Sequence, residues 1–81
     1  MASVTYYVAM GFERDPEGEL IAMEPMEAQS STQAISRARS LAASKAGAIA
    51  FSRTGDPEIG EFNDAVILFT AGDVPTDLPV G

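Results

Sequence analysis

The chain has 81 residues, a net charge of −7 at pH 7, and no cysteine, histidine or tryptophan. Without cysteine there are no disulfides, thiolate nucleophiles or cysteine-based zinc sites, and without histidine the commonest general base is missing. The acidic balance argues against general binding to nucleic acid or to anionic lipid.

An alternating segment at residues 4–12 predicts the first strand. One face of it carries Val4, Tyr6, Val8, Met10 and Phe12, and the other carries Thr5, Tyr7, Ala9 and Gly11. A turn is expected at residues 15–18, because proline presets φ there and glycine tolerates positive φ. The returning strand should run from Leu20 to about Met23. It can reach Ala28 only at a sheet edge or a bulge, because Pro25 has no N–H.

A helix is predicted to begin at Ser30, which stands in the capping-box relation to Gln33. Its apolar stripe at helical spacing consists of Ala34, Ile35, Ala38, Leu41, Ala42 and Ala46. Gly47 is expected to end the helix as a left-handed cap, with Lys45 in the last turn, where its charge favours the helix dipole. Because the stripe is mostly alanine, this helix can lie flat and close on a sheet.

Residues 48–54 and 62–71 predict a second pair of strands, joined by the turn TGDPEIG. The fold class is therefore α+β, with the order β-β-α-β-β and a four-stranded, mainly antiparallel sheet that carries one helix on one face. Residues 1–71 form a single domain, and residues 72–81 are expected to be an extended or disordered tail. The strand order stays open, since the second strand can lie beside the third and the first beside the fourth.

The two hairpins carry nearly the same phrase, FERDPEGEL at residues 12–20 and FSRTGDPEIGEF at residues 51–62. A helix of about sixteen residues rises roughly 24 Å, about the length of a seven-residue strand, so it returns the chain to the end from which the second strand came. The two acidic turns should then lie at opposite ends of the sheet. Neither turn has the spacing of a calcium loop, so we expect solvated acids, no metal site and no cofactor.

Charge is unevenly distributed along the chain. Residues 28–55 contain no carboxylate and four cations, whereas the remainder contains all twelve acids and one cation. Candidate contacts for an anion or an acidic partner are the four cations Arg37, Arg39, Lys45 and Arg53. The simpler expectation is a solvated helix face that pairs loosely with sheet carboxylates. The alternative is self-association, in which the positive helix of one copy meets the negative hairpins of another.

The last strand contains five consecutive apolar residues, AVILF at 65–69. A strand with one face in water should alternate, so both faces of this one require cover. Alternation would direct Val66 and Leu68 to one side and Ile67 and Phe69 to the other. One helix covers only one face of a sheet.

The other face must be covered by the tail, with Val74, Leu78 and Val80, or by a second copy. We expect a homodimer whose interface includes Tyr7, Ala9, Ile67 and Phe69.

These patterns predict a small, cytoplasmic, non-enzymatic protein that works as a homodimeric protein–protein interaction module. The order of strand, acidic hairpin, strand and alanine-rich helix over residues 4–46 also resembles, at the level of fold, the partner-neutralising antitoxins of the HicB type. The chain departs from that pattern because it has no Gly-Cys segment after the second strand and no acid in the helix. The alternatives are an acidic, antitoxin-like regulator that masks a basic partner, and a protein that binds an anion or small ligand.

Overall fold

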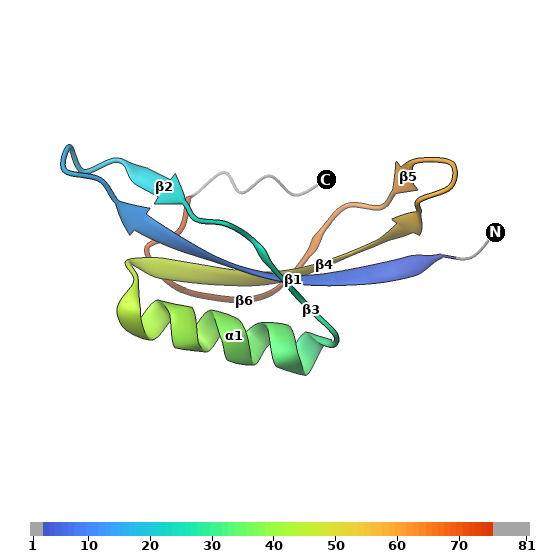
Figure 1. The fold of residues 1–81 in the computed structure, drawn as a ribbon, viewed down its shortest axis with the longest axis horizontal. Coiled ribbons are helices and arrows are strands. Elements are labelled where there is room, and N and C mark those ends of the chain that lie inside the picture. The colour runs from blue at the N-terminus through green and yellow to red at the C-terminus, as the bar shows by residue number, and fades with distance from the viewer. Residues whose placement is uncertain (1–2, 76–81) are drawn as a thin grey trace.

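The structure is a computed structural model that describes residues 3–75. Its elements are β1 (Val4–Arg14), β2 (Leu20–Ala22), β3 (Met26–Ala28), α1 (Ser31–Ser44), β4 (Gly47–Asp56), β5 (Glu61–Phe62) and β6 (Val66–Gly72). The strands form one antiparallel sheet, and α1 lies along one face of it (Figure 1). The predicted α+β class is confirmed.

Six strands occupy the four predicted strand positions, because two of those strands are interrupted. Both β2 and β3 pair with β1, and the break between them contains Pro25, which cannot donate to the ladder. Likewise, both β5 and β6 pair with β4, with residues 63–65 between them. The sheet therefore has β1 and β4 at its centre and a broken strand at each edge.

The central pairing of β1 with β4 runs from Val4 opposite Gly55 to Phe12 opposite Gly47. Both pairings that the sequence left open are therefore wrong, because the first predicted strand pairs with the third. Since β3 and β4 are each antiparallel to β1, they run parallel to each other and need a crossover connection. The helix provides it, passing across β1 to place β4 on the far side.

The two hairpin turns lie at opposite ends of the molecule, as predicted (Figure 1). The longest dimension of the structure is 45 Å, against 23 and 17 Å in the other two directions. Both ends of the sheet curl away from the helix.

The start of α1 agrees with the prediction. The Oγ of Ser30 accepts a hydrogen bond from the backbone N–H of Gln33 at 3.1 Å. In return, the Oε1 of Gln33 accepts from the N–H of Gln29 at 2.6 Å, one residue before the expected partner. Two backbone donors at the helix start are thereby satisfied.

The end of α1 differs from the prediction. The helix ends at Ser44, and Lys45 is the C-cap, with its N–H bonded to the carbonyl of Leu41 at 2.8 Å. Gly47 is not a left-handed cap, because it begins β4 and its φ is not positive. A Cβ on Gly47 would overlap the backbone of Asp73, so this position requires glycine for a close approach between two chain segments.

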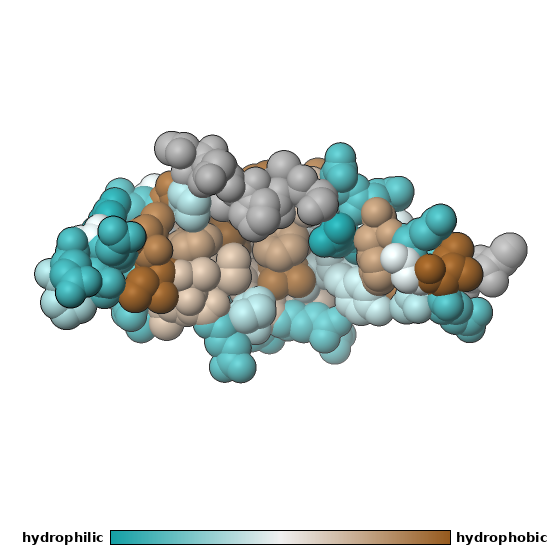
Figure 2. All heavy atoms as spheres, turned by 90° about the horizontal axis from the view of Figure 1, so that it is seen from above, coloured by the Kyte–Doolittle hydropathy of each residue, from teal (hydrophilic) through white to brown (hydrophobic). Residues whose placement is uncertain are grey.

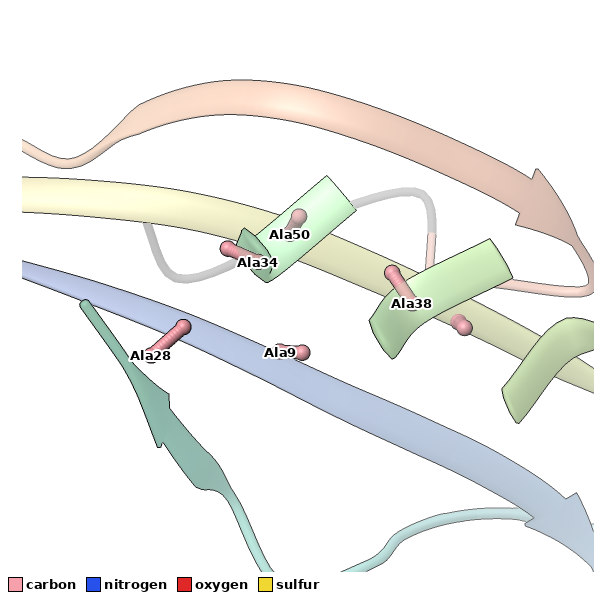
Figure 3. Close-up of a cluster of buried hydrophobic side chains, with 6 residues drawn as sticks. Ala9, Ala28, Ala34, Ala38 and Ala50 are labelled. Carbon is pink, nitrogen blue, oxygen red and sulfur yellow. The ribbon is translucent and has the colours of Figure 1, made fainter. Parts of the chain in front are cut away.

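The core between α1 and the sheet is built from small side chains. It is formed by six alanines, Ala9, Ala28, Ala34, Ala38, Ala48 and Ala50, and Figure 3 labels all of them except Ala48. Ala34 and Ala38 come from the helix, and the others come from β1, β3 and β4. The alanine stripe thus packs against alanines, which brings the helix close to the sheet.

Candidate functional site

Most of the larger side chains of β1 and β4 lie on the sheet face that points away from α1, called the open face below. Ala9 and Gly11 on β1 face the helix, so the residues that alternate with them face the other way. The strands place on the open face Val4, Tyr6, Val8, Met10, Phe12, Ile49, Phe51, Arg53, Phe62 and Ile67. Figure 2 looks onto this face, with hydrophobic residues over its middle and hydrophilic ones toward both ends.

Exposure of the large apolar side chains is concentrated in one half of the open face. Phe12 and Ile49 are only 3% exposed, whereas Val4, Tyr6, Phe62 and Ile67 are 36–38% exposed. Apart from Ile67 on β6, these exposed side chains lie toward the β5 hairpin. The expectation that Leu78 and Val80 cover this face lies outside the described residues.

A cluster of two rings and a cation occupies the exposed half of the open face. The rings of Tyr6 and Phe62 lie 6.1 Å apart at an angle of 44°. The guanidinium carbon of Arg53 lies 5.7 Å from the centre of the Phe62 ring, and the Nε of Arg53 donates to the carbonyl of Asn63 at 3.1 Å. The ring contact and the hydrogen bond both restrict the guanidinium, whose terminal nitrogens remain to bind a carboxylate.

The four predicted cations do not converge on one site. Lys45 pairs with Glu13 at 3.2 Å, and the guanidinium carbon of Arg39 lies 5.2 Å from the centre of the Phe69 ring, on the helix side. Arg37 is exposed on α1, beside a shallow groove between the helix and β3. Of these four cations, Arg53 is the one that the strands place on the open face. Among residues 3–75 the cations therefore form no common anion site.

The four predicted interface residues are also separated. Ala9 is fully buried beneath α1, and Tyr7 is half-buried against the same core. The expectation that these two residues lie on the uncovered face is wrong. The helix lies on the face with the smaller side chains, because a helix stripe of alanines packs closely only against small partners.

A β-bulge separates the other two predicted interface residues. Phe69 lies opposite Ala50 and Ile67 opposite Phe51, so Leu68 is an extra residue in β6. Leu68 and Phe69 consequently both pack toward the helix, whereas Ile67 points to the open face. The simple alternation expected along residues 66–69 is wrong for this reason.

The sequence interpretation missed Tyr6, Val4 and Phe62 as surface residues. Side-chain size was the available signal for which face the helix covers, because the face of β1 with the smaller side chains fits the alanine stripe of the helix. Hydrophobicity alone pointed to the opposite assignment.

Within residues 3–75, no group of three or more acids is placed to hold a metal ion. In the same part of the chain, no helix is long and apolar enough to cross a membrane.

Comparison with family models, with curated proteins and with solved structures found no match to this chain. The resemblance to HicB-type antitoxins is therefore limited to the order of strands and helix along the chain.

Proposed function

We propose that this chain is a non-enzymatic interaction module that works as a homodimer, with the open face as its contact surface. The observation that carries this proposal is the position of the helix. It covers the small-residue face and leaves Val4, Tyr6, Phe62 and Ile67 more than a third exposed on the other face. A group of large apolar side chains on one surface is typical of a protein interface.

The composition of the open face also supports this proposal. Aromatic residues and arginine are enriched where protein interfaces are most tightly bound, and Tyr6, Arg53 and Phe62 are in contact here. Their rings and guanidinium are already held against one another, so binding would cost little side-chain entropy.

Sedimentation velocity on the full chain at micromolar concentration tests this proposal, with two variants for comparison. Ile67→Asp places a charge on the open face and should convert the dimer to a monomer. Ile59→Asp makes the same change in the β5 hairpin turn, at a side chain that is 66% exposed, and should leave the dimer intact. A wild-type chain that sediments as a monomer would contradict the proposal.

An acidic regulator that masks a basic partner remains the second candidate. Its support is the exposure of the turn acids, including Glu17, Glu19 and Glu58. Such a complex would depend on long-range attraction between opposite charges, so its dissociation constant should rise steeply with salt. Binding through the apolar open face should respond far less to salt.

A further inference from the structure

The charges on the open face indicate how two copies would meet. Each copy carries a net charge of −7, so a dimer must bring together surfaces that are poor in acids. Among residues 3–75, the strands place a single carboxylate on the open face, that of Glu27. It lies opposite Val8 in the pairing of β3 with β1. The open face is therefore a part of this acidic molecule on which a second copy can dock without strong repulsion.

Arg53 is the cation that matches this carboxylate. Within the described part of the chain, it makes no ion pair, whereas the other open-face cation, Arg14, pairs with Asp73 at 3.5 Å. Arg53 is half-buried, and it is held by Phe62 and by the carbonyl of Asn63. A restrained arginine without a carboxylate partner is suited to receive one from another molecule.

The register of the sheet relates these two charges simply. Arg53 lies opposite Tyr6, and Glu27 lies opposite Val8 two residues further along β1. Their Cα atoms are thus about two strand spacings and two residues apart, on the order of 12 Å. Consider a two-fold axis that lies in the plane of the interface, midway between the two residues and perpendicular to the line that joins them. It places each residue over the other residue of the second copy. Packed sheets are about 10 Å apart, a separation that an arginine and a glutamate can bridge.

We propose that the open face docks on a second copy of this chain, with Arg53 of each copy paired to Glu27 of the other. This inference rests on the proposed homodimer and adds its charged contact and its symmetry. The symmetric arrangement forms the pair twice, and it surrounds both pairs with the apolar side chains of the two faces.

A charge-swap experiment on the full chain tests this arrangement. Arg53→Glu places two glutamates in each contact, and Glu27→Arg places two arginines there. Because like charges at an interface are strongly unfavourable, each variant alone should dimerise about tenfold more weakly or worse. An equimolar mixture of the two variants restores both pairs and should form heterodimers, which native mass spectrometry can count.

Matched controls make the same charge changes elsewhere. Arg37→Glu on α1 and Glu17→Arg in the turn between β1 and β2 are both at exposed positions outside the strands of the open face. Neither control variant should weaken the dimer, and their mixture should show no preference for heterodimers. Recovery in the charge-swap mixture also excludes misfolding of the single variants, because a misfolded chain would not be rescued by mixing.

The outcomes separate this inference from the proposed function. A wild-type dimer that is unchanged by Arg53→Glu and Glu27→Arg would overturn the paired arrangement but leave the homodimer standing. A wild-type monomer would overturn both. A second result would also overturn both: a wild-type monomer that becomes a dimer when Leu78 and Val80 are replaced by serine. The chain's own last residues would then be the occupant of the open face.

Discussion

At the scale of single residues, side-chain size determines which surfaces meet. Ala9 and Ala50 on the sheet allow Ala34 and Ala38 of the helix to approach closely, while the larger residues of the same strands point the other way. Glycine serves the same purpose at Gly47, where the backbone of Asp73 takes the space of a side chain. Close packing of this kind tolerates little added volume.

Gly47→Ala should therefore destabilise the fold by about 1–3 kcal/mol, because its Cβ must displace backbone atoms. Gly11→Ala is the matched control in β1. A Cβ there would meet the Sδ of Met23 at 3.3 Å and the Cγ of Lys45 at 3.6 Å, and both of these side chains can move. Urea unfolding at one fixed protein concentration measures the difference. An equal cost at both positions would argue against a special requirement at Gly47.

At the scale of elements, the start of α1 depends on one local contact. Ser30→Ala removes the acceptor for the N–H of Gln33 and should lower the free energy of unfolding by about 1 kcal/mol. Ser40→Ala makes the same chemical change at an exposed helix position and should cost nothing measurable. Thermal unfolding followed by circular dichroism compares the two variants. Similar losses in both would show that the cap contributes little.

The contact of α1 with the sheet provides a second prediction for this element. Ala38→Leu adds volume to a fully buried position between the layers and should destabilise the protein by about 1–3 kcal/mol. Ala43→Leu adds the same volume on the exposed side of the helix and should be nearly neutral. Denaturant unfolding of both variants tests the packing, and a neutral Ala38→Leu would mean that the helix does not lie close to the sheet.

Local signals in the sequence predicted most of the elements but not their assembly. The cap at Ser30 and the break at Pro25 depend on neighbouring residues, so both could be predicted. The pairing of β1 with β4 depends on contacts between distant residues, which no local pattern encodes. The bulge at Leu68 likewise appears only when β6 pairs with β4, and it reversed the expected direction of Phe69.

The candidate site was predicted only in part for a related physical reason. The sequence indicated that one sheet face lacks cover, and Ile67 does lie on that face. Hydrophobicity suggested that the helix would cover the side of Tyr6 and Phe12, yet packing follows shape as well as polarity. The alanine stripe fits the smaller face, so the helix does not cover the larger one.

At the scale of the whole molecule, the acidic turns lie at opposite ends and the apolar surface lies between them. In the proposed dimer, the apolar middle of each open face would provide the contact. The net charge of −7 opposes self-association, so the proposed dimer depends on contact through this apolar surface.

The most direct test of the open face as a contact surface is an isotope-filtered NMR experiment on a mixture of labelled and unlabelled chains. We predict intermolecular contacts from the rings of Tyr6 and Phe62 and from the methyl groups of Ile67. Contacts to these groups that arise only within one chain, at a concentration where every chain should be dimeric, would contradict the account.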